Sequence, residues 1–184
     1  LMVALLRAME IDARIALVRT ANLGYIEETP PSMWAFNHAI VYVPALDLYL
    51  DGTAEQSGWK ELPYMDQGGM ALVVAPPGSR EPDQLLRIPV DGPGKNLNRS
   101  EYELKIDQQG SMLIKGDEWF SGVRNAFIRR DMTDPAHRQE NLQRDLVEIM
   151  PGIEISTLNV GDLSLSNEEL TYSFEARVPH RAMQ

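Results

Sequence analysis

The chain has 184 residues, of which 17 are Lys or Arg and 27 are Asp or Glu, so its formal net charge is −10. A general nucleic-acid binder needs a basic surface, and anionic membranes attract basic segments, so this charge argues against both. The sequence contains no Cys, which excludes disulfides, thiolate metal sites and a cysteine nucleophile supplied by these residues. No apolar run approaches the ~20 residues needed to span a bilayer, so we expect no direct membrane insertion.

The first predicted element is a helix over residues 1–9. These residues favour helix and are apolar around almost the whole circumference, with Arg7 as the interruption, which is typical of a buried helix. No capping residue precedes the first turn, so we expect the sequence to be part of a longer chain. The basic leader and small-residue cleavage site of a signal peptide are missing. The cellular location is therefore left open, with a periplasmic or exported parent as one alternative.

Strands dominate the next part of the chain. Residues 21–35 are a predicted loop, because Pro30 and Pro31 exclude helix there. Runs of apolar and β-branched residues on either side predict strands. The predicted strands are 13–20, 36–43 and 46–51, with 61–66 and 71–75 as further candidates.

The second half begins with a predicted hairpin, in which Gly110 suits a left-handed turn position. Asp134 is a natural N-cap, and Pro135 fits the first position of the helix that follows. The apolar stripe of this helix is Leu142, Leu146 and Ile149. The predicted elements are strands 102–107, 111–120, 153–160 and 170–178, a short helix over 121–131, and the helix from 135 to 149. Turn-rich residues 91–96 separate two units, 1–92 and 97–184, and the fold class is α+β.

His38 and Asp51 are the candidate functional pair. If Val43 opposes Leu46 across the turn, His38 opposes Asp51 on the same face of the hairpin. A carboxylate that accepts from one imidazole nitrogen fixes the tautomer and leaves the other nitrogen to relay a proton. A register shift of one residue would place the two side chains on opposite faces. The alternative reading is a structural His–Asp pair that closes the hairpin.

Other candidates are weaker. Ser32 is close in sequence but lacks the elbow motif of a serine nucleophile, and Trp34 and Phe36 either wall a cleft or, more simply, pack in the core. His38, His137 and His180 are widely spread and match no metal motif, so we expect no metal site and no cofactor. The basic cluster of Arg124, Arg129 and Arg130 reads as a solvated helix face.

The first part of the chain resembles the later portion of a bacterial transglutaminase-like domain, which belongs to the papain-related superfamily of cysteine acyltransferases and proteases. Two short motifs, Asn37-His38-Ala39 and Asp51-Gly52-Thr53, match the strands of that family that carry its catalytic His and Asp. The helix and first strand match the family at Leu5, Leu6, Arg7, Ala8, Ile11, Ala13 and Arg14. Glu10 stands where the family usually has Gly after the helix, and we expect it to shift or loosen that helix end. Residues 97–184 loosely resemble the accessory domain of unknown function that follows this core.

The resemblance implies the C-terminal part of a papain-like core, a buried helix on an antiparallel sheet, followed by a small β-rich accessory domain. It implies thiol-based acyl transfer on protein or peptide amides, with His38 and Asp51 as two members of a triad. The family's Cys would lie a few residues before Leu1, so this chain is expected to be inactive alone. Water as acceptor would make a protease or amidase, and an amine would make a transglutaminase. The alternatives are a protein- or envelope-binding module with a vestigial His–Asp pair, or a structural spacer. Oligomeric state is left open.

Overall fold

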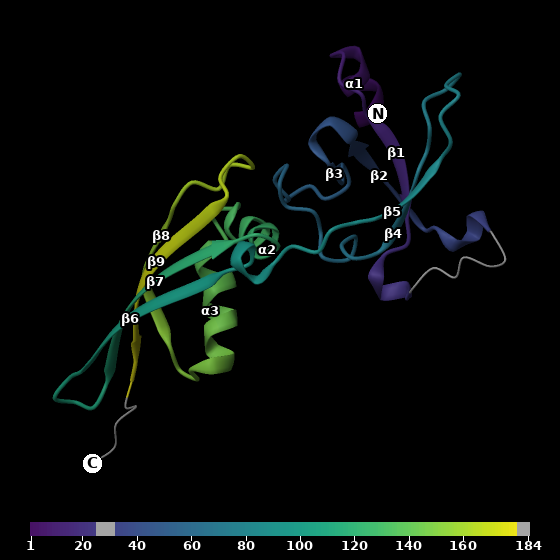
Figure 1. Ribbon diagram of the computed structural model, residues 1–184. Coiled ribbons are helices and arrows are strands. Elements are labelled where there is room, and N and C mark those ends of the chain that lie inside the picture. The colour runs from purple at the N-terminus through teal and green to yellow at the C-terminus, as the bar shows by residue number, and fades with distance from the viewer. Residues whose placement is uncertain (25–31, 180–184) are drawn as a thin grey trace. The chain divides into compact units, whose positions relative to one another are not determined.

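The computed structural model describes residues 1–24 and 32–179 (Figure 1). Three α-helices and two antiparallel sheets confirm the α+β class. The chain divides into two compact units, Leu1–Gly92 and Pro93–Gln184. The second unit begins before residue 97, because its first residues are tied to the hairpin that follows. The Ser121 hydroxyl donates to the Lys95 carbonyl at 2.8 Å, and the Val123 N–H donates to Oδ1 of Asn96 at 3.0 Å.

The first unit is built on a five-stranded sheet with strand order β3-β2-β1-β4-β5 (Figure 1). All of its strand pairs are antiparallel. The strands are β1 (Arg14–Val18), β2 (His38–Val43), β3 (Leu48–Leu50), β4 (Met70–Val73) and β5 (Gln84–Arg87), and the short 3-10 helices are Ala21–Leu23, Met33–Ala35 and Pro44–Leu46. One strand expectation was wrong and one strand was missed. Residues 61–66 form no strand, and the Asp66 N–H donates to the Pro63 carbonyl at 3.0 Å in a turn. Strand β5 was missed because it has only four residues, two of them polar.

Both faces of this sheet are apolar. One face carries Ala13, Val41 and Val43, and the other carries a larger cluster that includes Val18, Ile40, Tyr49, Ala71, Val73 and Ile88. Leu62, from the long connection between β3 and β4, packs against the larger cluster. This connection therefore covers the face on which the even-numbered residues of β2, and hence His38, lie.

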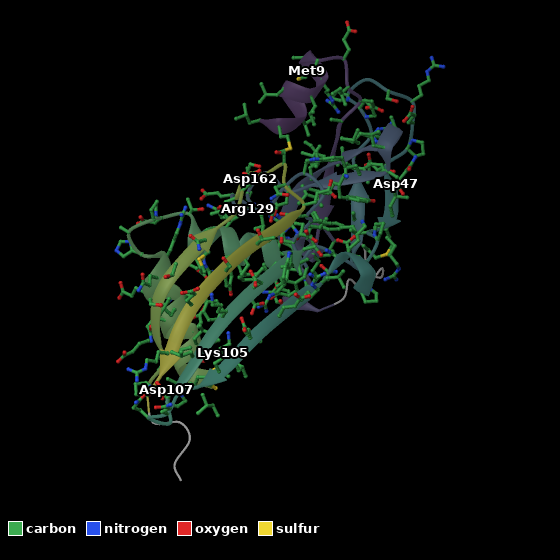
Figure 2. The ribbon with its side chains drawn as sticks, turned by 90° about the vertical axis from the view of Figure 1, so that its left-hand side faces the viewer. Met9, Asp47, Lys105, Asp107, Arg129 and Asp162 are labelled. Atoms are coloured by element: carbon green, nitrogen blue, oxygen red, sulfur yellow. The ribbon has the colours of Figure 1, made fainter. Side chains whose placement is uncertain are left out.

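The first helix, α1 (Met2–Ala8), is not buried, in contrast to the prediction. Its residues Met2, Val3 and Leu6 pack against the Ala13 cluster. On the other side, Leu1 and Leu5 are 98% and 57% exposed, and Met9, just after the helix, is 69% exposed (Figure 2). A helix with apolar side chains all round is expected to be buried on all sides. Within this unit, only one face of the sheet contacts the helix.

Glu10 ends the helix in the left-handed conformation, with φ of 61°. The Glu10 N–H donates to the Arg7 carbonyl at 3.0 Å, and the Ile11 N–H donates to the Leu6 carbonyl at 3.0 Å. This pair of bonds is the Schellman motif, which normally places Gly at the left-handed residue. Glu10 thus adopts the left-handed conformation that Gly usually supplies, and two hydrogen bonds close the helix end.

The register of the β2–β3 hairpin differs from the prediction. Val43 pairs with Leu48 rather than with Leu46, and Tyr42 pairs with Tyr49. The turn is longer than expected, because Pro44–Leu46 form a 3-10 helix and Asp47 adopts a left-handed conformation with φ of 46°. A shift by two residues keeps the paired side chains of β2 and β3 on their predicted faces, whereas a shift by one would have reversed them. Leu46, expected on the aliphatic core face, instead lies in the turn and is 68% exposed.

The second unit pairs a four-stranded antiparallel sheet, in the order β6-β7-β9-β8, with two helices (Figure 1). Its elements are β6 (Asn98–Ile106), β7 (Met112–Ser121), α2 (Arg124–Met132), α3 (Arg138–Ile149), β8 (Glu154–Val160) and β9 (Glu169–Val178), after a 3-10 turn at Pro93–Lys95. Leu142 and Leu146 join Ile114, Phe120 and Phe174 in one core. Gly110 has the expected positive φ, of 78°.

Two details of α3 differ from the prediction. Ile149 is 71% exposed rather than part of the buried stripe. The helix begins at Arg138, and Asp134 instead caps the preceding turn, where its Oδ1 accepts from the Ala136 N–H at 2.9 Å. Across the described residues, no helix combines the length and apolar character that a membrane crossing requires.

Candidate active site

His38 is the first residue of β2, at the end of the sheet where β1 finishes. It pairs with Val18, the last residue of β1. The preceding residue, Asn37, fixes this corner. Its side-chain oxygen accepts from the Thr20 N–H at 2.9 Å, and its side-chain amide donates to the Thr20 hydroxyl at 2.9 Å. Asn37 therefore sets where β2 begins and how His38 leaves the strand.

Asp51 follows directly after β3 and meets His38 on the same face. The distance between Nε2 of His38 and Oδ2 of Asp51 is 3.1 Å, and their side chains are 23% and 6% exposed. The second oxygen of Asp51, Oδ1, accepts from the N–H and the hydroxyl of Thr53, each at 2.8 Å. Thr53 thus holds the carboxylate in the orientation that its contact with His38 needs.

The two oxygens of Asp51 have different partners, because Oδ2 faces His38 and Oδ1 accepts from Thr53. The imidazole faces this carboxylate through Nε2, so Nδ1 is the nitrogen left to exchange a proton with a reacting group. The structure therefore brings together the two residues selected from the sequence, although they do not oppose each other directly in the ladder.

A third acid, Asp66, belongs to the same cluster and was missed by sequence reasoning. Its side chain is buried, with 3% exposure. One donor or acceptor atom from each of His38, Asp51 and Asp66 lies within 4.8 Å of the other two. Asp66 lies in the connection between β3 and β4, which is anchored where the Ala21 N–H donates to the Met65 carbonyl at 2.7 Å. The sequence signal that could have identified Asp66 was an acidic side chain within residues 61–66. The rest of that run is mostly apolar, and the run was interpreted as a strand.

The environment of Asp66 favours its protonated form. The pKa of Asp66 is raised from 3.8 to about 6, mainly by burial and in addition by the charge of the Asp51 carboxylate and a hydrogen bond with it. The proximity of His38 acts in the opposite direction. Ionisation of both carboxyl groups in a desolvated site costs free energy, because the two negative charges repel each other. One of the two groups therefore retains its proton to higher pH.

The three side chains also present one nitrogen and two oxygens, the donor types that divalent cations bind. The contacts describe a hydrogen-bonded network instead. Both oxygens of Asp51 already accept from His38 and Thr53, so a cation bound to Asp51 would have to displace the His38 contact.

The other sequence candidates lie outside this network. Oγ of Ser32 accepts from the Trp34 N–H at 3.2 Å, and so acts as a helix cap. Trp34 is 94% exposed, so the expectation that it packs in the core was wrong, and Phe36 is partly buried. His137, in the second unit, contacts Asp134 at 2.6 Å. His180 lies outside the described residues.

The arginine cluster of α2 is divided between core and surface. Arg129 is 1% exposed and donates to the Asn167 carbonyl at 2.7 Å, so it is not part of a solvated face (Figure 2). Arg130 is exposed, and its side chain pairs with Asp131 at 2.9 Å.

A cavity of about 510 Å³ lies between the start of α1, strands β1 and β2, and the two residues that follow Asp51. Its walls include Leu1, Met2, Ala39, Gly52 and Thr53. Met2 approaches Gly52 so closely that its Cε would be 2.8 Å from a Cβ at that position. The first turn of α1 therefore neighbours residues adjacent in sequence to both His38 and Asp51.

No protein-family model, curated protein or solved structure matches this chain.

Proposed function

We propose that this chain is the His- and Asp-bearing portion of a transglutaminase-like cysteine enzyme that transfers acyl groups from protein or peptide amides. The observation that carries the proposal is the 3.1 Å contact between Nε2 of His38 and Oδ2 of Asp51 at the ends of adjacent strands. The two motifs around these residues, Asn37-His38-Ala39 and Asp51-Gly52-Thr53, supply the resemblance to that class.

The proposed reaction follows from the roles of the two ring nitrogens. Asp51 accepts from Nε2 and stabilises the imidazolium, while Nδ1 takes the proton of a cysteine thiol. The thiolate attacks the amide carbonyl, the C–N bond breaks, and the leaving amine receives the proton from Nδ1. Water or a second amine then attacks the thioester carbonyl and passes a proton to Nδ1, the C–S bond breaks, and the sulfur leaves as a thiolate beside the imidazolium.

The thiol must come from residues beyond this sequence, which contains no Cys. The start of α1 lies beside the residues that follow Asp51, because Leu1 and Met2 line the same cavity as Gly52 and Thr53. The helix itself packs on the sheet face opposite to His38, so a backward continuation would have to bring the thiol around the end of the sheet. A cysteine a few residues ahead of Leu1 would lie near the first turn of α1, beside this cavity.

The test compares this chain with the same chain extended ahead of Leu1 by a helical segment that carries one cysteine. We expect peptide-amide cleavage or amine incorporation only from the extended protein. A matched extension with Ser in place of the cysteine is the control, and it should be inactive. Turnover by the unextended chain would overturn the proposal. So would an extended protein that folds but has a thiol with ordinary alkylation kinetics.

A second candidate, a non-catalytic protein-binding module, is favoured by one feature of the second unit. Strand β6 lies at the edge of its sheet, and all nine of its residues are exposed. Exposed edge strands can pair with an added strand from a partner. This candidate gains support if Lys105→Pro in β6 abolishes partner binding while His38→Ala leaves binding intact.

A further inference from the structure

The Asp51 carboxylate has more neighbours than a catalytic dyad requires. His38 contacts Oδ2, Thr53 supplies two donors to Oδ1, and the buried side chain of Asp66 completes the cluster. Burial, the charge of Asp51 and the hydrogen bond between the two carboxyl groups all favour a proton on Asp66.

We propose that Asp66 is a positioning residue of this site, which holds a proton against the Asp51 carboxylate and so sets how strongly Asp51 draws on the Nε2 hydrogen of His38. Asp66 does not touch the reacting atoms in this scheme. When it is protonated, it donates to Asp51 and withdraws negative charge from the carboxylate that faces His38. When it ionises, the two acids place a second negative charge beside the imidazole.

The location of Asp66 supports a role in the site rather than in folding. Its side chain is 3% exposed, and its electrostatic neighbours are Asp51, after β3, and His38, at the start of β2. The hydrogen bond between the two carboxyl groups and the charge of Asp51 both favour the proton on Asp66, whereas the charge of His38 opposes it. Ionisation of Asp66 would place a second negative charge beside Asp51 in a desolvated site, and the charge of His38 offsets this only in part.

The arrangement predicts a shared titration. Because the two carboxyl groups are in contact, loss of the proton from Asp66 must change the electronic environment of both, and they report one macroscopic step. The catalytic consequence rests on the proposed function: the rate of the cysteine-extended protein would follow the protonation of Asp66 as well as that of the thiol and the imidazole.

The test uses the chain as it is, with ¹³C-labelled aspartate, and follows the side-chain carboxyl signals between pH 4 and 8. We expect the Asp66 signal to move with a midpoint near pH 6 and the Asp51 signal to move with the same midpoint. In Asp66→Asn, which keeps a hydrogen-bond donor but cannot ionise, this step should disappear from the Asp51 signal. In Asp51→Asn, the Asp66 midpoint should fall by about one pH unit.

Glu55→Gln is the matched control, because it removes one negative charge from an exposed residue of the same connection and should leave both midpoints unchanged. An Asp66 signal that titrates in the ordinary range of aspartate, or an Asp51 signal that does not share the step, would overturn the proposal. Zinc chloride that binds tightly to these carboxyl groups would also overturn it, by showing a cation in place of the proton.

The outcome is separable from that of the proposed function. If the cysteine-extended protein is inactive but Asp51 and Asp66 still titrate together, the acyl-transfer proposal is wrong and the role assigned to Asp66 still holds. Should Asp66→Asn fail to fold, the titration of the unmodified chain still decides the question. In an active extended protein, Asp66→Asn should retain turnover and lose the pH 6 inflection of its pH profile, whereas Asp66→Ala should lower turnover across the pH range.

Discussion

Asp51 reaches His38 from beyond the end of the β2–β3 ladder. The β2–β3 pairing ends at Val41 and Leu50. The 3.1 Å contact between His38 and Asp51 therefore joins two residues that are not paired with each other's strand. Strand pairing alone does not hold this contact in place. The Thr53 donors on one side and the bonds between Asn37 and Thr20 on the other fix the two side chains.

The first prediction concerns the pair formed by His38 and Asp51. In the cysteine-extended protein, His38→Ala and Asp51→Asn should each lower turnover by about 10³-fold or more, because either change removes the oriented proton acceptor for the thiol. The measurement is steady-state hydrolysis of a peptide amide. Asp47→Asn is the control, since Asp47 lies on the same hairpin and bonds to the Tyr42 hydroxyl at 3.0 Å. Equal losses in all three variants would mean that the hairpin, rather than the dyad, was disturbed.

Glu10 gives a prediction about stability. Its left-handed φ of 61° costs a side-chain-bearing residue about 1–2 kcal/mol, which Gly avoids. Glycine also loses more entropy on folding, so Glu10→Gly should raise the free energy of unfolding by about 1 kcal/mol. Urea denaturation measures the change. Met9→Gly, one residue earlier at φ of −95°, should not be stabilising. A destabilised Glu10→Gly protein would contradict the strain at this helix end.

Asp66 should make the stability of the first unit depend on pH. Its pKa is raised from 3.8 to about 6 on folding, so its stabilising contribution is complete below pH 3.8 and is lost as pH rises through 6. At about 1.4 kcal/mol per pH unit, this difference corresponds to about 3 kcal/mol. Asp66→Asn should therefore be more stable than the parent chain by roughly this amount at pH 8, with the gain shrinking toward pH 4.

Thermal or urea unfolding at pH 4, 6 and 8 measures this dependence. Glu55→Gln, an exposed charge change in the same connection, should alter stability little at any of these values. A gain from Asp66→Asn that does not change with pH would show that ionisation of Asp66 is not its source.

The buried arginine of α2 gives a prediction for the second unit. Arg129→Ala removes a donor to the Asn167 carbonyl from the core and should cost about 3 kcal/mol. Arg130→Ala, next to it on the exposed side, should cost no more than about 0.5 kcal/mol. Denaturant unfolding of both variants is the measurement, and similar costs would refute the division of this cluster between core and surface.

Sequence reasoning reached the strands, the second-unit helices and the His–Asp pair because they depend on local patterns. Alternation along residues 36–43 and 46–51 fixes which side chains share a face, and this survives a register shift of two. Glu10 was correctly placed at a helix end, but its conformation depends on hydrogen bonds that only the folded chain shows. Asp66 was missed because its role arises from burial by residues distant in sequence, and Arg129 because helix periodicity does not reveal which face a neighbouring loop covers.

The connection that carries Asp66 has a consequence for the order in which the molecule assembles. His38 and Asp51 lie in one hairpin, whereas Asp66 lies in the connection that leads to β4, which pairs with β1. Contacts between near neighbours in the chain form faster than those that must first close a longer loop. We expect β2 and β3 to pair before β4 joins β1, so that the complete cluster belongs to the later stage of assembly.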